Sequence, residues 1–330
     1  MSTLYLDRRD LELRLDGKTL ALYLQGQRTR TIPLSLLERI VITGAGTRLT
    51  SGVLLQLAAH GVSTIVLHGR SHKEAVFLLG PAHGDATIRR NQLRCADDPA
   101  FRNAWAARRI REKIRRQLRY LDRWMSKRPD LRRPLHRARS ALTGTLENLE
   151  ASPPMERTLG LEGAAARAWF QAYATLLPPS LGFRGRHRRP PPDPVNAALS
   201  LAYTLLHADA VRASHAAGLD AGTGFYHQPS HGRESLASDL VEPLRPAVDA
   251  WVYGLFRDRF LEASHFKADQ GAMLLGKNGR GRFFGACEHR ARPFRRWLRQ
   301  DTRTLVRLLR GNATEESPQA LGPHGEETSR

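Results

Sequence analysis

The first eighty residues alternate apolar and polar side chains in the way that β-strands do. Residues 4–15 (LYLDRRDLELRL) and 20–34 (LALYLQGQRTRTIPL) follow this two-residue period, and Asp-Gly-Lys at 16–18 is a typical turn between them. Shorter β-branched runs occupy residues 39–44, 62–69 and 74–81. The pattern predicts a strand in each of these segments.

One helix interrupts the predicted strands. Residues 50–61 (TSGVLLQLAAHG) have helical spacing, Thr50 or Ser51 is suited to cap the N-terminus, and Gly61 follows the C-terminal end. We therefore expect a small β-rich domain with one helix over residues 1–84.

After residues 84–90 the spacing becomes helical and the chain becomes very basic, as far as about Leu146. One predicted helix face carries Ile110, Ile114, Leu118 and Leu121. The basic residues that cover most of its remaining surface are Arg108, Arg109, Arg111, Lys113, Arg115, Arg116 and Arg119. Residues 126–134 (SKRPDLRRP) break this helix, and a second helix follows.

The pattern remains helical beyond a linker at 151–154 (ASPP). Residues 161–177 (LEGAAARAWFQAYATLL) predict an alanine-rich helix. Asp193 is suited to cap another long helix and Pro194 to be its first residue, with more helix as far as about residue 261.

The C-terminal part predicts three further segments. Residues 271–290 (GAMLLGKNGRGRFFGACEHR) indicate a polar hairpin or loop, and residues 293–311 indicate a terminal helix. Residues 312–330 have the composition of a disordered tail. The fold class is therefore α+β, with a larger, mostly α-helical domain over residues 85–311.

The net charge of the chain indicates what kind of partner the protein binds. The 330 residues contain 52 Lys and Arg against 32 Asp and Glu, a formal net charge of +20. Arginine far outnumbers lysine and is suited to bidentate phosphate contacts. A GC-rich genome would explain part of the arginine content, but an imbalance of this size predicts a polyanionic partner, most simply nucleic acid. A membrane surface fits less well, because the basic helices lack an aromatic-rich apolar face.

Other features of the sequence indicate the compartment. No apolar run approaches the roughly 18–20 residues that cross a bilayer, and the acidic, alternating start is unlike a signal peptide. Cys95 and Cys287 are the two cysteines, so the sequence has no disulfide framework and no cysteine-rich zinc module. We expect a cytoplasmic protein without a membrane partner.

Residues 226–246 (YHQPSHGRESLASDLVEPLRP) gather histidines, carboxylates and a hydroxyl. Pro229 prevents a helix from presenting His227 and His231 as an i, i+4 metal-binding pair. From residue 234 the spacing is helical, and one face carries Ser235, Asp239 and Glu242. Pro243 kinks or ends this helix.

Two carboxylates one turn apart repel each other unless a cation compensates. Asp239 and Glu242 could be balanced by Arg245 or by a metal ion, or they could lie on a solvated helix face. Glu162, at the predicted start of the alanine-rich helix, suits a first-turn acid that complements the helix dipole. The basic loop at 186–194 (RHRRPPPDP) could be a solvated turn or a phosphate clamp.

Three motifs occur together in a characteristic order: LGLEGAAARAWF, then RHRRPPPDPVNAALSLAYTLL, then GFYHQPSHGRESLASDLVEPLRP. In this combination the chain resembles the CRISPR-associated spacer-acquisition integrases, the Cas one family. The segments IPLSLLERIVITGAGTRLTSGVLLQLAAHGVSTIVL and RRNQLRC are similar to the β-domain, linker and first helices of that family. The resemblance covers about residues 3–310.

The resemblance implies an N-terminal β-domain, which dimerises, and a helical catalytic domain with a divalent-metal site. Carried over by motif, the metal ligands are Glu162, His227 and Glu242, with Asp239 as a further catalytic acid that supports the metal or holds a second ion. Arg188 and Arg189 match the basic loop of the family and Asn196 a position near its site; with Arg245 they are expected to contact DNA. Ser235, Tyr203 and Tyr226 are candidate hydrogen-bond donors around the metal.

One histidine with two or three acids suits Mg²⁺ or Mn²⁺ better than zinc. The resemblance implies double-stranded DNA as a partner, both the prespacer and the CRISPR repeat, and a homodimer that assembles with a dimer of the small protein Cas two. It implies an endonuclease and integrase that inserts spacer DNA by transesterification, with a DNA 3′-OH or water as nucleophile. Two alternatives remain: a metal-dependent nuclease on branched or single-stranded DNA without integration, and a non-enzymatic basic scaffold.

Overall fold

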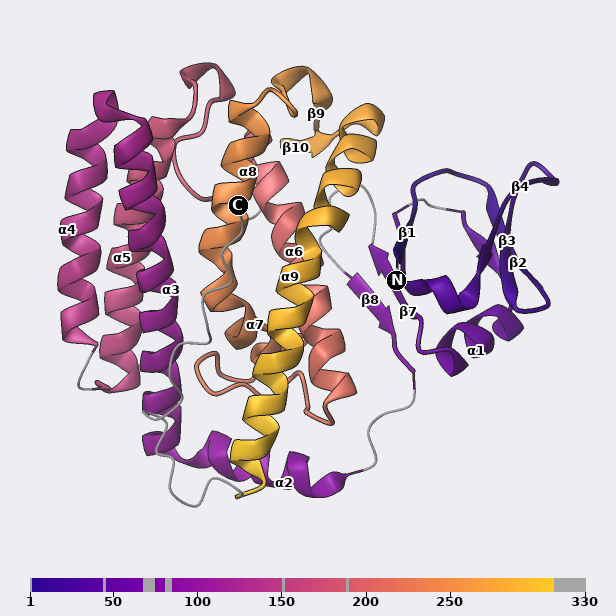
Figure 1. Ribbon diagram of the computed structural model, residues 1–330, viewed down its shortest axis with the longest axis horizontal. Coiled ribbons are helices and arrows are strands. Elements are labelled where there is room, and N and C mark those ends of the chain that lie inside the picture. The colour runs from indigo at the N-terminus through magenta and orange to yellow at the C-terminus, as the bar shows by residue number, and fades with distance from the viewer. Residues whose placement is uncertain are drawn as a thin grey trace.

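The computed structural model describes residues 2–43, 46–67, 75–80, 85–149, 152–187 and 190–311. Two β-sheets lie at one side of the molecule, and a larger bundle of helices fills the rest (Figure 1). The predicted fold class, α+β with a small β-rich part followed by a mostly helical part, is confirmed. The predicted boundary at residue 84 and the predicted tail at 312–330 lie outside the described residues.

Among its described residues, the β-rich part contains two four-stranded sheets and one α-helix. The first sheet has the order β1-β5-β7-β8, where β5 is parallel to both β1 and β7 and β8 is antiparallel to β7. The second has the order β4-β3-β2-β6. The strands are β1 (Ser2–Leu6), β2 (Leu11–Asp16), β3 (Thr19–Leu24), β4 (Gln27–Pro33), β5 (Leu37–Ile42), β6 (Arg48–Leu49), β7 (Ser63–Leu67) and β8 (Ala75–Leu78).

The predicted helix between the strands is α1 (Ser51–Ala59), and the Thr50 side chain caps it by accepting a hydrogen bond from the Val53 N–H. Gly61 follows the helix with a φ of 68°, as predicted.

The central strands of the first sheet, β5 and β7, are mostly buried on both faces. In β5, Ile40 and Ile42 pack into the core between the two sheets, whereas Val41 packs against the helices. In β1, the Tyr5 ring stacks on Phe284 of the last helix with 4.5 Å between centroids. Because side chains alternate along a strand, one strand contributes to two cores. The sheet therefore joins the β-rich part to the helical part.

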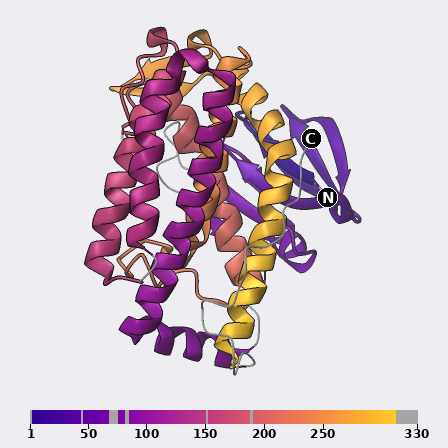
Figure 2. The ribbon, with the colours of Figure 1, turned by 60° about the vertical axis from the view of Figure 1, so that its left-hand side comes forward.

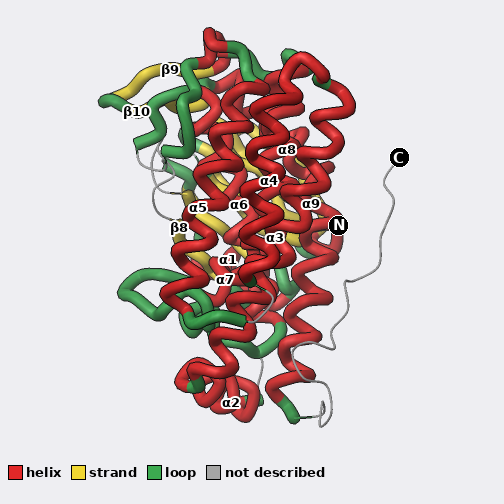
Figure 3. Tube along the Cα trace, turned by 90° about the vertical axis from the view of Figure 1, so that its left-hand side faces the viewer, coloured by secondary structure: helices red, strands yellow, loops and turns green. Residues whose placement is uncertain are grey.

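The helical part contains eight α-helices and a short hairpin among the described residues (Figures 1 and 3). The helices are α2 (Ala86–Asp97), α3 (Pro99–Lys127), α4 (Arg132–Asn148), α5 (Met155–Leu176), α6 (Pro194–Ala216), α7 (Ser235–Val241), α8 (Arg245–Arg257) and α9 (Lys277–Leu309). Strands β9 (Phe266–Asp269) and β10 (Ala272–Leu275) form the hairpin. Asp193 caps α6 and Pro194 is its first residue, as predicted.

Two predicted boundaries are wrong. Helix α5 begins at Met155, so Glu162 lies inside the helix and does not act as a first-turn acid. Only residues 272–275 of the predicted C-terminal hairpin or loop are a strand, and α9 begins at Lys277 and continues through Pro293 as one helix of 33 residues. Burial of Phe283 and Phe284 against Tyr5 and Trp251 stabilises this glycine-rich stretch as a helix.

The basic surface predicted for α3 is partly wrong. Ile110, Ile114 and Leu121 are buried as predicted, but Arg108, Arg109 and Lys113 are buried with them. Arg109 lies over the Trp105 ring at 4.1 Å and forms an ion pair with Asp301 of α9 at 2.8 Å. Those three basic side chains stabilise the interior and are not available to a ligand on the outer surface.

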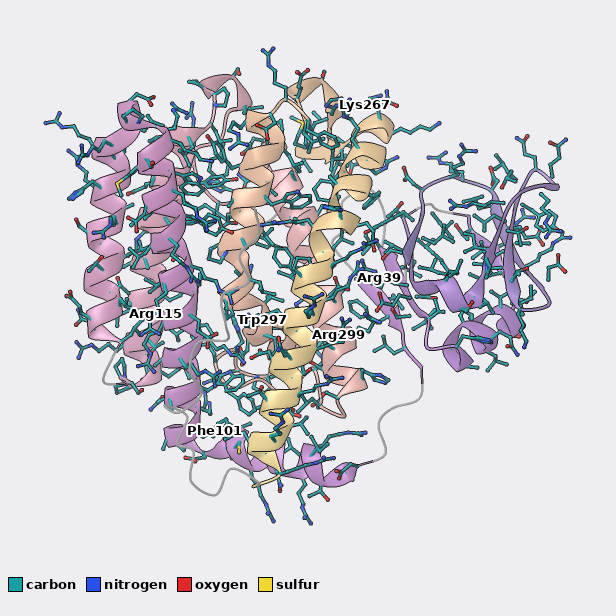
Figure 4. All side chains as sticks on the ribbon, in the orientation of Figure 1. Arg39, Phe101, Arg115, Lys267, Trp297 and Arg299 are labelled. Carbon is teal, nitrogen blue, oxygen red and sulfur yellow. The ribbon has the colours of Figure 1, made fainter. Side chains whose placement is uncertain are left out.

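A buried ion-pair network crosses from the sheet to the helices. Arg39 of β5 binds Asp209 of α6 at 2.6 Å, and Asp209 also accepts from Arg295 of α9 at 3.2 Å. Glu288 of α9 completes the network by binding Arg295 at 2.9 Å. Figure 4 shows Arg39 at the junction between the β-rich part and α9. In the part of the chain that the structure describes, none of the helices has the length and apolar character needed to cross a membrane.

Candidate functional site

Two carboxylates and a lysine meet where α3, α5 and the end of α7 come together. The Nζ atom of Lys113 donates to Glu162 Oε1 at 2.5 Å and to Glu242 Oε2 at 2.8 Å. Glu162 comes from the third turn of α5, and Glu242 is the first residue of the 3₁₀ turn that follows α7. Two predicted site residues that are 80 positions apart in the chain thus share one cation.

Pro243 places Glu242. Helix α7 ends at Val241, a 3₁₀ turn spans Glu242–Leu244, and α8 begins at Arg245, as the absence of an N–H at Pro243 predicts. This break brings Arg245 back towards Glu242, and its Nε donates to Glu242 Oε1 at 2.6 Å.

Glu242 is therefore held between two cations. Burial alone would raise the pKa of Glu242, but Arg245 and Lys113 lower that pKa well below its usual range. Burial would likewise lower the pKa of Lys113, and the two glutamates outweigh it and raise that pKa. Glu242 is therefore an ionised carboxylate that only accepts hydrogen bonds.

Asp239 is fully buried and organises the histidine. Its carboxylate accepts the backbone N–H groups of Phe225, Tyr226 and His227 at 2.7, 2.9 and 2.8 Å. Its Oδ1 is also 2.8 Å from Nδ1 of His227. Because a carboxylate accepts, Nδ1 is assigned as the donor and Nε2 is the nitrogen left for a ligand. Asp239 thus orients His227 and has no oxygen free of hydrogen bonds.

Gly224 makes this loop possible. A Cβ at this position would lie 2.6 Å from the carbonyl oxygen of His227 and 2.7 Å from the backbone carbon of Ser235. Only glycine allows the chain before His227 to approach the start of α7 so closely.

The other predicted donors have different positions. Tyr226 is buried beside the acids. Burial raises the pKa of its hydroxyl, and the nearby carboxylates of Glu162, Glu242 and Asp239 raise it further. Ser235 Oγ donates to the carbonyl of Gln228 and stabilises the loop. His231 is an exposed loop residue, in agreement with the exclusion of a paired histidine site.

Tyr203 belongs to a second buried group next to the site. Its hydroxyl donates to Asp249, which also accepts from Trp169 Nε1 at 2.9 Å. The Arg245 guanidinium lies 4.8 Å from the centre of the Tyr203 ring. Burial raises the pKa of Asp249 to about 6. This group supports Arg245, and through it Glu242.

The predicted DNA-contacting residues divide into three cases. Asn196 is fully buried; its side chain binds Asp193 and the backbone at Gly185 and His187, so it anchors the base of the loop and is not exposed to DNA. Arg245 is only partly exposed and binds Glu242. Arg188 and Arg189 lie outside the described residues.

The donor set fits a hard divalent ion. Among the described residues, no three His, Cys, Asp or Glu side chains are already gathered as a metal site, because the Lys113 ammonium lies between the two glutamates. Two carboxylates that converge on one cation position, with an oriented imidazole near Glu242, are ligands that Mg²⁺ or Mn²⁺ accepts.

Sequence reasoning missed Lys113. Periodicity places this lysine on the basic surface of α3, but it also flanks the apolar stripe, one position from Ile114 and three from Ile110. A basic residue at the edge of an apolar stripe is a candidate for a buried ion pair, and this spacing was the available signal.

Comparison with known proteins agrees with these features. The family described as "CRISPR associated protein Cas1" matches residues 4–289. The chain belongs to the Cas1 family. A "CRISPR-associated endonuclease Cas1 1" from Thermodesulfovibrio yellowstonii is 38% identical over 310 residues, which is 93% of this chain and 94% of that protein. The resemblance inferred from the three sequence motifs is therefore confirmed.

Two solved structures share the fold. A "Casposase bound to integration product" superposes with a TM-score of 0.84 at 20% identity, over 100% of this chain and 96% of that one. A "Cas6-RT-Cas1--Cas2 complex" matches with a TM-score of 0.81 at 25% identity, over 95% of this chain and 35% of that one. The fold of a Cas1 protein is thus present from end to end of the described residues.

Proposed function

We propose that this chain is a metal-dependent DNA endonuclease and integrase of CRISPR adaptation, which inserts spacer DNA into the CRISPR array by transesterification. Membership of the Cas1 family gives the endonuclease class. The observation that carries the metal-dependent chemistry is the convergence of Glu162 and Glu242 on one cation, near a histidine that Asp239 orients.

Glu162, His227 and Glu242 would hold Mg²⁺ or Mn²⁺. A bound divalent ion supplies Lewis-acid polarisation of a phosphodiester and lowers the pKa of the attacking hydroxyl or water. Asp239 keeps the Nδ1 side of His227 occupied, so that Nε2 faces the ligand. Arg245 holds the second oxygen of Glu242, which fixes the direction of the other oxygen.

Exposed arginines on two helices support a DNA surface. Helix α9 runs along the outside of the molecule (Figure 2). One face of it, continued by the residue just after its end, carries exposed arginines at intervals of three or four residues. They are here called the α9 arginine row: Arg292, Arg296, Arg299, Arg303, Arg307 and, just past the helix end, Arg310. At 1.5 Å per residue the row is about 27 Å long, and on α3 the exposed Arg115 and Arg119 add to its charge.

Such a row suits the phosphates of a duplex and carries no direct sequence readout. The α9 arginine row is thus the proposed DNA surface, in place of the basic residues of α3 that are buried: Arg108, Arg109 and Lys113.

The partners follow from the relatives. One structural neighbour is titled as a complex of Cas1 with Cas2, so we propose that this chain assembles with a Cas2 dimer. We also propose a homodimer formed through the β-rich part, acting in the prokaryotic cytoplasm on prespacer DNA and the CRISPR repeat. The casposase, solved with an integration product, has the same fold, so this scaffold is compatible with strand transfer.

The test is joining of a labelled 3′-OH duplex to a supercoiled plasmid that bears a repeat, with Mn²⁺ or Mg²⁺ and the Cas2 partner. Wild type should join the label, and Glu162→Gln, His227→Ala and Glu242→Gln should not, although each still binds DNA. Cleavage without joining, even with the partner, would favour the alternative of a nuclease that does not integrate. No reaction with unchanged DNA binding would leave only a scaffold.

A further inference from the structure

Lys113 fills the cation position between two proposed metal ligands. Its side chain is only 9% exposed, and its Nζ is 2.5 Å from one oxygen of Glu162 and 2.8 Å from one oxygen of Glu242. Without a cation there, the buried carboxylate of Glu242 and the partly buried carboxylate of Glu162 would face each other with reduced solvent screening. The ammonium therefore meets a need of the site when no metal is bound.

The charges around this position are balanced. Glu162 and Glu242 carry two negative charges, and Lys113 and Arg245 carry two positive charges. Adding a divalent ion while the ammonium stays would leave an excess of positive charge in a buried site. It would also place two cations at the same carboxylate oxygens. The ammonium and the metal ion are therefore competitors for one position.

The two basic residues differ in how firmly they are held. Arg245 binds the other oxygen of Glu242 and lies over the Tyr203 ring, at 4.8 Å from its centre. Lys113 reaches the glutamates through a flexible four-carbon stem that ends in a point charge. Lys113 is thus the residue that can withdraw while Arg245 remains.

We propose that Lys113 is a resident cation that the divalent metal must replace on Glu162 and Glu242. This inference rests on the proposed function, in which those two glutamates bind the metal. Lys113 keeps the ligands together before metal arrives, and it makes metal binding weaker than the same ligands would otherwise give. A lysine freed from both carboxylates is then available to an anionic group of the substrate.

Mn²⁺ binding tests this exchange without any activity assay. Free Mn²⁺ is titrated by electron paramagnetic resonance, and thermal melting is recorded with and without Mn²⁺, for wild type, Lys113→Gln and the control Lys127→Gln. Lys127 lies on the same helix and is exposed. We expect Lys113→Gln to bind Mn²⁺ at least tenfold more tightly than wild type. Its melting temperature should be lower than that of wild type without Mn²⁺ and should rise more when Mn²⁺ is added. The control should match wild type. Equal or weaker Mn²⁺ binding by folded Lys113→Gln would overturn the exchange.

Two further variants keep the outcome decisive. Lys113→Arg retains the positive charge if Lys113→Gln does not fold, and it should bind Mn²⁺ no more tightly than wild type; tighter binding would count against the competition. Glu162→Gln should bind Mn²⁺ more weakly. If Glu162→Gln binds Mn²⁺ as tightly as wild type, the proposed metal site itself is wrong. If Glu162→Gln binds Mn²⁺ more weakly but Lys113→Gln binds it like wild type, only the exchange is rejected.

Discussion

The carboxylate of Asp239 lies 2.8 Å from Nδ1 of His227 and also accepts the backbone N–H of that residue at 2.8 Å. One buried side chain thus fixes both the ring of the histidine and the loop that carries it. As a proposed metal ligand, His227 would lose little freedom on binding, because its orientation is set in advance.

Asp239→Asn tests this relationship. The backbone N–H groups of Phe225, Tyr226 and His227 now donate to the Asp239 carboxylate. The NH₂ group of an asparagine would face at least one of these N–H groups, so that two donors would meet without an acceptor. We expect a loss of about 2–3 kcal/mol in the free energy of unfolding. We also expect Mn²⁺ affinity to fall by about 10–100-fold, measured by calorimetry. Asp258→Asn, at an exposed ion pair with Arg257, is the control and should change neither. Normal Mn²⁺ affinity in Asp239→Asn would show that the orientation of His227 does not matter.

Asp249 predicts a pH dependence of stability. Its pKa is raised from 3.8 to about 6, so the folded state binds this proton more tightly than the unfolded state. Asp249 therefore adds most to the free energy of unfolding below pH 4, and this stabilisation, about 3 kcal/mol in full, is lost as pH rises through 6. The free energy of unfolding of wild type relative to Asp249→Asn should therefore fall by about 2.4 kcal/mol between pH 4 and pH 7, in urea titrations.

The control for this measurement is Asp97→Asn, an exposed change on α2. If wild type gained stability over Asp249→Asn as pH rose, the donors Tyr203 and Trp169 would outweigh burial, and the assigned direction would be wrong.

Asp209 tests the junction between the sheet and the helices. Asp209→Ala leaves Arg39 and Arg295 buried without their shared carboxylate. We expect a loss of about 3–5 kcal/mol in the free energy of unfolding by urea. The matched change Asp122→Ala breaks an exposed pair with Arg139 and should cost about 0–1 kcal/mol. Similar losses in the two variants would mean that the network does not hold the two parts together.

The α9 arginine row predicts the salt dependence of DNA binding. Arg303→Gln with Arg307→Gln should lower the slope of log affinity against log salt by about 2, because two phosphate contacts are removed. Arg137→Gln with Arg139→Gln, both exposed on α4, removes the same charge elsewhere and should leave the slope near that of wild type. Fluorescence anisotropy on a duplex measures both. Equal slopes for the two double variants would place the DNA away from α9.

Local signals in the sequence predicted the elements well. The alternation in β2 and β3, the β-branched run in β5, the caps at Thr50 and Asp193 and the break at Pro243 all depend on a few neighbouring residues. The length of α9 could not be predicted in this way. Its first half contains several glycines and leads into Pro293, and contacts of Phe283 and Phe284 with Tyr5 and Trp251, distant in the chain, stabilise it as a helix.

The site was predictable only in part, for a similar reason. The family motifs pointed to Glu162, His227, Asp239 and Glu242 as candidates. The repulsion between Asp239 and Glu242 predicted a compensating cation such as Arg245, which does bind Glu242. Lys113 comes from another helix, 49 residues before Glu162, and its contacts depend on how α3, α5 and the turn after α7 pack. The surface assigned to α3 failed because periodicity does not reveal which arginines find buried partners.

One measurement tests the central claim most directly: a crystal soaked in Mn²⁺, with anomalous diffraction recorded near the manganese absorption edge. The account predicts one strong peak bounded by Glu162, His227 Nε2 and Glu242, with the Lys113 ammonium withdrawn from both glutamates. Full Mn²⁺ occupancy elsewhere, or no peak while Lys113 still bridges the two carboxylates, would contradict it.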